Sequence, residues 1–245
     1  MVTGASSDIG AAIALELAKD GYALWLTYHE AREKAEDVAR LCREVGAETC
    51  LSQLDLRSLQ SIQALVGDVN REWGELHVLI NNAGLCSFAG YESITSDDWD
   101  TVLETNARGT FLLTRECLPL LRRAKESGAD RTIINISAIA GQVGALQAGI
   151  HFAASKAAVL AITRSFARLL AKEGIRVNAV SPGPVDTSMI DHVPPERKQT
   201  LGSAVPIGRF GTAEEVAWIA FCLASPRASF ATGATYDVNG GVRID

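Results

Sequence analysis

The sequence predicts an α/β protein with a doubly wound parallel sheet of about seven strands and helices on both faces. Short apolar segments rich in β-branched residues alternate with amphipathic helical segments from end to end, which is typical of parallel sheets. The strand segments are continuous apolar runs, as expected for strands that are covered on both sides. The 245 residues fit one domain over 1–245, and no low-complexity linker or repeat divides them.

The first half of the chain begins with a strand remnant, Met1-Val2, that leads directly into a glycine-containing turn. Helices are predicted where apolar residues recur three and four positions apart, opposite a charged side. Strands are predicted from short runs of β-branched, aromatic and other apolar residues. In chain order we expect a helix over 11–19, a strand over 23–28, a helix over 31–45, a strand over 51–54, a helix over 61–73 and a strand over 77–80.

Capping residues indicate two helices in the second half. Ser96 is expected to cap a helix that continues to about Lys125, and Thr212 a helix over 213–224, because their hydroxyls accept from first-turn amides. A proline-rich stretch, 182–206, predicts a mobile lid at about 184–206 rather than regular structure. The other expected elements are a strand over 131–136, a long alanine-rich helix over 150–172, and strands over 175–180 and 235–238.

Composition excludes several classes of protein. The net charge of −6 disfavours a generic nucleic-acid binder, and no apolar run reaches the ~18 residues of a membrane span. The five cysteines are scattered without Cys-x-x-Cys spacing. This pattern favours reduced thiols and a cytoplasmic location, without a metal site.

A glycine-containing turn over 3–10, TGASSDIG, lies between the strand remnant and the first helix. Glycines let backbone N–H groups approach a diphosphate at the positive end of a helix. Such a turn alone is a weak signal, because an ordinary strand-to-helix turn looks similar. Further motifs follow in order: Asn81-Asn82-Ala83-Gly84, Asn106 within ETNARG, Asn135-Ile136-Ser137, Ala154-Ser155-Lys156, Pro182-Gly183 and the closing DVNGG.

Together, and in this order, these motifs resemble the short-chain dehydrogenase/reductase family, classical type, over the whole chain. The resemblance implies a Rossmann-type fold and hydride transfer between a nicotinamide cofactor and a carbonyl or secondary alcohol. It implies that Asp55 contacts the adenine and that Lys156 holds the nicotinamide ribose. The implied cofactor-binding residues are Gly4, Ser6, Ser7, Asp8, Ile9, Gly10, Tyr28, Asp55, Leu56, Asn82, Ala83, Gly84, Lys156, Pro182, Gly183, Val185 and Thr187.

NADP(H) is favoured over NAD(H) as the cofactor. An NAD site carries an acid at the end of the second strand, and here that place holds Tyr28 or His29. Arg32 or Lys34 would reach a 2′-phosphate, although both also suit the solvated face of a helix. Asp8 stands where the resemblance implies a glycine. Its carboxylate would weaken diphosphate binding, yet it suits the positive end of a helix.

The catalytic positions depart from the family pattern. The resemblance implies a Tyr that protonates the forming alkoxide, a Lys four residues later, a Ser and an Asn. Asn106 and Lys156 are present, but the Tyr and Ser positions hold Phe152 and Ala138. Neither has a hydroxyl, and the neighbouring Ser137 would point to the opposite face of a strand. Loss of a general acid usually lowers the rate by ~10²–10⁴-fold.

Three interpretations of this loss stay open. The chain is an inactivated variant of a reductase, because Tyr→Phe and Ser→Ala remove little more than the hydroxyls. Alternatively, it is an enzyme with another proton donor, such as His151. The third interpretation is a non-catalytic, nucleotide-binding subunit. An oxidoreductase is the first of these hypotheses.

The expected substrate is a small carbonyl compound, with 3-oxoacyl thioesters as a candidate, because length and lid are most similar to the 3-oxoacyl-carrier-protein reductases. Basic residues that such reductases commonly carry would match Ala129 and Glu173, which are not basic. Nearby Arg122, Arg123, Lys125 and Lys172 would have to substitute for them. The expected apolar wall, several members of which also suit a plain core, comprises Leu85, Cys86, Phe88, Val143, Leu146, Met189 and Ile190.

The resemblance also implies a homodimer or homotetramer, in which long helices pair across a twofold axis. The family's first strand normally carries several apolar residues before its Thr-Gly. We therefore expect a full-length first strand in the biological protein, although only Met1-Val2 precede that dipeptide here. The face expected to pair holds Ala153, Ala157, Ala161, Phe166 and Leu169.

Overall fold

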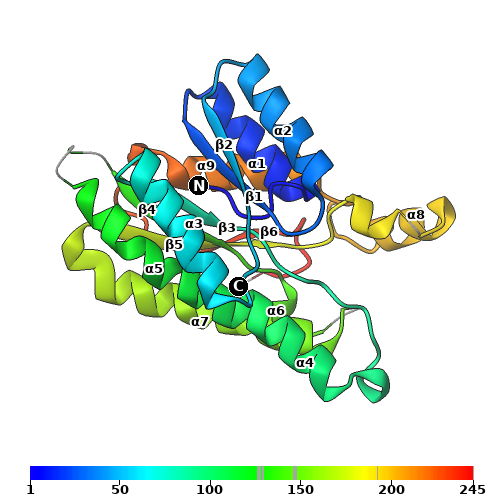
Figure 1. Cartoon of the computed structure of the whole chain (residues 1–245). Helices are drawn as coiled ribbons and strands as arrows, with labels where there is room; N and C mark the ends of the chain where they lie inside the picture. The colour runs from blue at the N-terminus through cyan, green and yellow to red at the C-terminus, as the bar shows by residue number, and fades with distance from the viewer. Residues whose placement is uncertain (126–127, 129, 146–147, 192, 245) are drawn as a thin grey trace.

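A parallel sheet runs through the molecule, and helices cover both of its faces (Figure 1). The computed structural model describes residues 1–125, 128, 130–145, 148–191 and 193–244. On one side, β1 (Leu24–Tyr28) pairs with β2 (Thr49–Gln53). On the other, four strands pair in the order β3 (Val78–Asn81), β4 (Arg131–Ile136), β5 (Ile175–Pro182) and β6 (Thr235–Val238).

Val2 joins the two halves of this sheet. It forms parallel bridges to Leu26 of β1 and Ile80 of β3, and its N–H donates to the Trp25 carbonyl at 2.8 Å. The expectation of about seven strands is therefore corrected to six strands among the described residues, with Val2 bridging the central place. Two residues before the turn provide a bridge but are too few for a ladder.

Two apolar cores confirm the doubly wound arrangement. One core joins the sheet to α1 (Asp8–Lys19), α2 (Arg32–Glu44) and α9 (Ala213–Ala224). The other joins its opposite face to α3 (Leu59–Glu72), α5 (Gly109–Arg123) and α7 (Ile150–Leu170). Strands β3, β4 and β5 are buried along their whole length, as expected for strands that are covered on both faces.

The connection between β3 and β4 contains α4 (Ser96–Leu103), which ends in a π-helical turn, η2 (Glu104–Arg108), that leads into α5. Thr95 rather than Ser96 caps α4. Its hydroxyl accepts from the Asp98 N–H at 3.1 Å, and the Asp98 carboxylate accepts from the Thr95 N–H at 3.0 Å. This reciprocal capping box satisfies more donors than Ser96 alone would, so the predicted cap was wrong by one residue.

The segment after β5 contains regular secondary structure, whereas the sequence predicted a lid without it. It contains a 3₁₀ turn, η4 (Ser188–Ile190), and the helix α8 (Pro195–Ser203), which projects from the body of the molecule in Figure 1. The helix was missed because its residues are largely polar, with Pro194 just before it and Pro195 as its first residue. Proline at the first helical position is favourable, since that N–H has no helical partner.

The remaining bounds differ from the expected ones mainly at element ends. The long helix stops at Leu170 and continues as the 3₁₀ turn η3 (Ala171–Glu173), while β5 extends to Pro182. Both predicted ends of β4, β6 and α9 agree with the structure, as do the ends of α1 and β1 and the starts of α7 and β5. The other short elements are η1 (Tyr91–Ser93), α6 (Ala140–Val143) and η5 (Pro226–Ala228).

Candidate active site

In the glycine-containing turn, close contacts leave no room for a side chain at Gly4 or Gly10. Gly4 has a φ of +65°, a conformation that favours glycine. A Cβ on Gly10 would lie 2.2 Å from the Gly4 carbonyl oxygen. Ser7 caps α1, because its hydroxyl accepts from the Gly10 N–H at 3.2 Å and donates to the Gly4 carbonyl at 2.8 Å. The first turn of α1 therefore opens at a narrow backbone cradle suited to an anion.

Asn82, just beyond the end of β3, fastens this turn to the sheet. Its amide Nδ2 donates to the Thr3 carbonyl at 2.9 Å and to the Gly4 carbonyl at 3.2 Å. In return, the Thr3 hydroxyl accepts from the N–H groups of Asn82 and Ala83, each at 3.0 Å. The motif after β3 and the turn after Val2 thus form one rigid unit.

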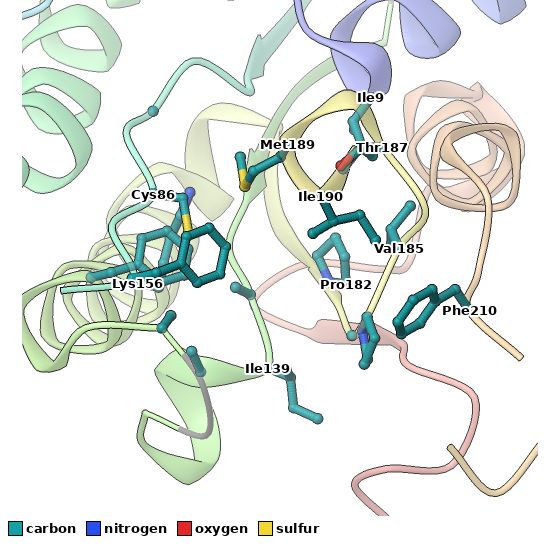
Figure 2. A pocket seen from close by; sticks show the side chains of 18 of the residues that line it. Ile9, Cys86, Ile139, Lys156, Pro182, Val185, Thr187, Met189, Ile190 and Phe210 are labelled. Atoms are coloured by element: carbon teal, nitrogen blue, oxygen red, sulfur yellow. The ribbon is translucent and has the colours of Figure 1, made fainter. Parts of the chain in front are cut away.

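A cavity of about 790 Å³ opens beside this unit, at the carboxyl ends of β4 and β5. Figure 2 shows Cys86 and Lys156 on one wall, with Val185, Ile190 and Phe210 on the other. Of the expected apolar wall, five residues line the cavity, Val143 is exposed instead, and Leu146 lies outside the described residues. The five are Leu85, Cys86, Phe88, Met189 and Ile190.

Lys156 projects from α7 into this cavity. It is buried, and its Nζ donates to the Ile136 carbonyl at 2.8 Å. Burial disfavours its charged form and lowers the pKa of Lys156 to about 8. Its Nζ lies 5.8 Å from the centre of the Phe152 ring, one helical turn earlier.

The two positions without hydroxyls, Ala138 and Phe152, both line the cavity. Phe152 packs with Val102 and Ala140 in a small apolar cluster. The hydroxyl of Ser137 donates to the Lys156 carbonyl at 2.9 Å, so its hydrogen bond is made to the backbone of α7. The structure thus places Ala138 and Phe152, the expected catalytic positions, in one cavity, but neither residue has a hydroxyl.

Asn106 lies in the π-helical turn η2 and is fully hydrogen-bonded. Its Oδ1 accepts from the Leu85 N–H at 2.7 Å, and its Nδ2 donates to the Leu85 carbonyl at 2.8 Å and to the Ser155 hydroxyl at 2.9 Å. A Cβ on Gly84 would lie 2.9 Å from Asn106 Oδ1. Asn106 therefore fixes the loop after β3 against α7. Single π turns of this kind are frequent at functional sites.

The residues expected at the adenine end of the cofactor lie at the end of β1 and just after β2. Tyr28 ends β1, and the nearby Arg32 donates through Nε to Glu36 at 2.7 Å. The Asp55 carboxylate accepts from the Arg57 N–H at 2.9 Å. Leu56 is buried beside Gly109, so its side chain supports the helix α5.

Of the remaining residues expected to bind the cofactor, six line the cavity, and Ser6 lies in the turn at the start of α1. The six are Ile9, Gly84, Pro182, Gly183, Val185 and Thr187.

Asp8 makes a contact that the sequence did not reveal. Its Oδ2 accepts from the N–H of Ser188 at 2.9 Å and from the Ser188 hydroxyl at 2.7 Å. The first residue of α1 is thereby tied to the 3₁₀ turn η4, 180 residues later in the chain. No local pattern marks Ser188, since the contact depends on how the segment after β5 folds back.

His151 does not face the cavity. Its imidazole is fully buried, stacks on Trp99 of α4 with ring centres 6.5 Å apart, and leaves both nitrogens without a hydrogen-bond partner. A Cβ on Gly149 would lie 2.5 Å from the ring. This position, behind the cavity wall, does not favour His151 as the proton donor.

The surface proposed for an acyl carrier is only partly described. Glu173 forms an ion pair with Arg122, with N–O distances of 2.7 and 3.0 Å. The guanidinium of Arg122 is therefore partnered within the chain. Ala129, the other position compared with the carrier-protein reductases, lies outside the described residues.

The fold and site define a class: an α/β protein with a tight glycine-containing turn at its first helix and, beside it, a buried lysine in an apolar cleft at the carboxyl ends of its strands. Among the described residues, no group of three His, Cys, Asp or Glu side chains could hold a metal ion. No helix in the described ranges is both long and apolar enough to cross a bilayer.

Comparisons with known proteins agree with this class. A sequence model of the family described as enoyl-(acyl carrier protein) reductase matches residues 4–243. The chain is 37% identical to the 3-oxoacyl-[acyl-carrier-protein] reductase FabG of Staphylococcus aureus over 242 residues, covering 99% of this chain and 96% of that protein. The chain therefore belongs to the short-chain dehydrogenase/reductase family, whose members are NAD(P)-dependent oxidoreductases.

Two solved structures are also similar. A Burkholderia xenovorans structure ascribed to the short-chain dehydrogenases/reductases superposes with a TM-score of 0.89 at 31% identity, covering 98% of this chain and 96% of that one. The Pseudomonas aeruginosa RhlG/NADP active-site complex gives a TM-score of 0.92 at 30% identity, covering 98% and 94%. Both confirm the Rossmann-type fold.

Proposed function

We propose that this chain binds NADP(H) and receives a carbonyl or secondary-alcohol compound, with 3-oxoacyl thioesters as the favoured class. One observation carries the proposal: Ile9 of the glycine-containing turn, Lys156 and an apolar wall line a single cleft of about 790 Å³. Apolar walls with few polar groups suit an acyl chain that ends in one reactive oxygen. The 3-oxoacyl-[acyl-carrier-protein] reductase FabG at 37% identity supports the substrate class.

The residues present fit a dinucleotide. A Cβ on Gly4 or Gly10 would come within 3 Å of neighbouring atoms, so the turn is a bare backbone cradle at the start of α1. The turn would hold the diphosphate, Asn82 to Gly84 the ribose side, and Lys156 the nicotinamide ribose. When bound, the cofactor supplies the hydride. The carboxamide end would meet Pro182, Gly183, Val185 and Thr187.

We favour NADP over NAD because of the residue that ends β1. Tyr28 ends that strand, so no acid stands where an NAD ribose would need one. Arg32 is exposed, and its surface ion pair with Glu36 is weak enough for a phosphate to replace. The RhlG complex, which contains NADP, supports this choice.

The same proposal accounts for the missing hydroxyls. Their absence would disable proton transfer to the substrate and leave the rest of the site in place. Lys156 and Asn106 keep their hydrogen bonds, and Phe152 and Ala138 line the cavity. We therefore favour a reductase framework in which substrate protonation is disabled. The alternative, a non-catalytic nucleotide-binding subunit, would keep the cofactor site but would not turn over even with both hydroxyls restored.

Binding and turnover separate these alternatives. NADPH and NADH should each be titrated by nucleotide fluorescence, and a panel of 3-oxoacyl thioesters assayed with the chain and with its Ala138→Ser/Phe152→Tyr variant. We expect tighter binding of NADPH than of NADH, and turnover only in the variant. Tight NADPH binding without turnover in either protein would favour the subunit. Failure of both cofactors to bind would contradict the proposal.

The segment 184–206 and the oligomer complete the proposal. We propose that η4 and α8 form a lid, because Thr187, Met189 and Ile190 line the cavity from that segment. We also propose a homodimer or homotetramer in a cytoplasmic setting. The five free cysteines support a reducing compartment.

A further inference from the structure

Lys156 is a buried amine that reaches the cavity without an acidic partner. Its side chain belongs to a residue only 7% exposed, and its Nζ donates to a neutral carbonyl, that of Ile136, at 2.8 Å. Among the described residues that line the cavity, none is an Asp or Glu. Buried ammonium groups are normally paired with a carboxylate. This one is held instead in surroundings that favour the uncharged amine.

A second lysine in the same cavity shows the contrast. Lys198 of α8 also lines the cavity, but its Nζ lies 3.2 Å from Asp186 and 3.3 Å from Asp191. Burial lowers the pKa of Lys198, while its hydrogen bonds to the two carboxylates outweigh that effect and raise it. Lys198 therefore remains an ammonium ion, which is not a nucleophile.

The groups around Lys156 leave its nitrogen free to react. On the loop after β3, burial raises the pKa of the Cys86 thiol to about 11, so this thiol is neutral where Lys156 titrates. On α7, the Phe152 ring lies 5.8 Å from Nζ and contributes no hydroxyl. Just after β4, the Ser137 hydroxyl donates to the Lys156 carbonyl at 2.9 Å. A carbonyl compound in the cavity thus meets an unpaired amine beside an apolar wall.

We propose that Lys156 is a covalent carbonyl-binding site, at which the uncharged amine forms an imine with a ketone or aldehyde, especially a 1,3-dicarbonyl compound. The nitrogen lone pair attacks the carbonyl carbon, and the carbonyl oxygen takes up a proton to give a carbinolamine. Loss of that hydroxyl together with the remaining N–H proton releases one water and leaves C=N. With a 1,3-dicarbonyl compound the product rearranges to a conjugated enaminone. No oxidant, reductant or metal is needed.

This inference rests on the proposed function only for the ligand class, a carbonyl compound. Desolvated lysines in apolar pockets are activated for this reaction. Because the proposed function places the nicotinamide ribose on Lys156, NADPH and the imine should compete for one amine.

The test is labelling with 2,4-pentanedione, followed by intact mass and peptide mapping. The chain has six lysines, so each molecule contains its own controls. We expect one adduct, with the mass of the probe minus water and near-ultraviolet enaminone absorbance. It should form at Lys156 at least tenfold faster than at Lys198 or the other four. The rate at Lys156 should level off above pH 8, whereas exposed lysines should keep gaining reactivity toward pH 10 and above.

Matched variants complete the experiment. Lys156→Arg should remove the fast adduct and Lys198→Arg should leave it. Equal labelling of all six lysines in the unmodified chain would overturn the proposal, whatever the fate of the variants. Saturating NADPH should slow labelling several-fold. If NADPH binds but Lys156 never labels, the imine site is wrong and the cofactor site stands. Fast labelling at Lys156 with no NADPH binding would support the imine site and contradict the proposed function.

Discussion

At the scale of single residues, Gly10 shows how strictly the nucleotide turn is specified. A methyl group there would sit 2.2 Å from the Gly4 carbonyl oxygen and 2.6 Å from Asn82 Nδ2. Backbone cannot move aside as a flexible side chain can. We predict that Gly10→Ala weakens NADPH binding at least tenfold and lowers the free energy of unfolding by about 1–3 kcal/mol.

Gly67 is the matched control for this substitution. It lies inside α3, and a Cβ there would meet nothing within 4 Å. Gly67→Ala should leave NADPH affinity unchanged and stabilise the chain by roughly 0.5–1 kcal/mol, because alanine favours a helix. Fluorescence titration and urea unfolding measure both quantities. Equal effects of the two substitutions would contradict this explanation.

The titration of Lys156 predicts a pH-dependent stability. Its pKa falls from 10.5 to about 8 on folding, so the unfolded chain binds more protons between these values. The free energy of unfolding should therefore rise with pH from about 8 to 10.5, and the penalty below pH 8 is at most about 3 kcal/mol. Lys156→Met should be more stable than the parent at pH 7, by about 1–3 kcal/mol, and lose that advantage by pH 10.5. A Lys156→Met protein that is less stable at both pH values would contradict the unpaired-amine account.

Residue types were easier to predict than their partners. The glycine positions, Asn106 and Lys156 were identifiable because the order of the motifs along the chain resembles one family, and that resemblance implies their roles. The contact between Asp8 and Ser188 was not, since it joins segments 180 residues apart. His151, proposed from its place beside Phe152, proved to lie behind the cavity wall. Adjacent positions on a helix point about 100° apart, and sequence proximity therefore gave no guide to its direction.

At the scale of elements, hydrogen bonds between α1 and η4 connect the proposed nucleotide turn to the proposed lid. Asp8 holds Ser188 through two hydrogen bonds, with its carboxylate at the start of α1. A bound diphosphate would place negative charge near that carboxylate. Asp8→Asn should therefore tighten NADPH binding roughly fivefold at low salt and less at high salt, since screening weakens the repulsion.

Ser188→Ala is the control for this interpretation. It removes the hydroxyl contact to Asp8 but leaves the charge in place, so it should not reproduce the gain in NADPH affinity. It should instead increase cleavage of the segment 184–206 in limited proteolysis. If Ser188→Ala tightens binding as much as Asp8→Asn does, release of the lid, rather than charge, controls affinity.

Prediction of an element's bounds succeeded where either burial or a helix cap marks its ends. The strand β4 and the helix α9 agreed in both bounds, because one is buried along its whole length and the other has a capping box at Thr212 and Glu215. The helix α8 was missed, since its polar residues follow two prolines. The π turn around Asn106 also escaped prediction. Helical periodicity cannot reveal one extra residue per turn in so short a stretch.

At the scale of the whole molecule, the outer face of α5 and α7 remains open in the single chain. Phe111 is 40% exposed and stacks on Phe166, and Leu169 is 71% exposed. The small residues Ala157 and Ala161, earlier on the same helix as Leu169, are also exposed. We predict that this face pairs two copies of the chain. Phe111→Glu should shift the oligomer to a smaller species by light scattering at matched concentration.

Leu41 provides the comparison for that shift. It has the same 40% exposure but lies on α2, away from the predicted pair. Leu41→Glu should leave the oligomer unchanged. A parent chain that is monomeric at all accessible concentrations would contradict the predicted interface.

The central claim is that an intact reductase framework lacks only its two hydroxyl groups. The most direct measurement is kcat for NADPH oxidation with a 3-oxoacyl thioester, compared between the chain and its Ala138→Ser/Phe152→Tyr variant, with NADPH affinity measured in both. We predict that kcat rises by ~10²-fold or more, as expected for recovery of a general acid, while the Kd for NADPH changes less than about twofold. Unchanged kcat in a folded variant that binds NADPH normally would contradict the claim.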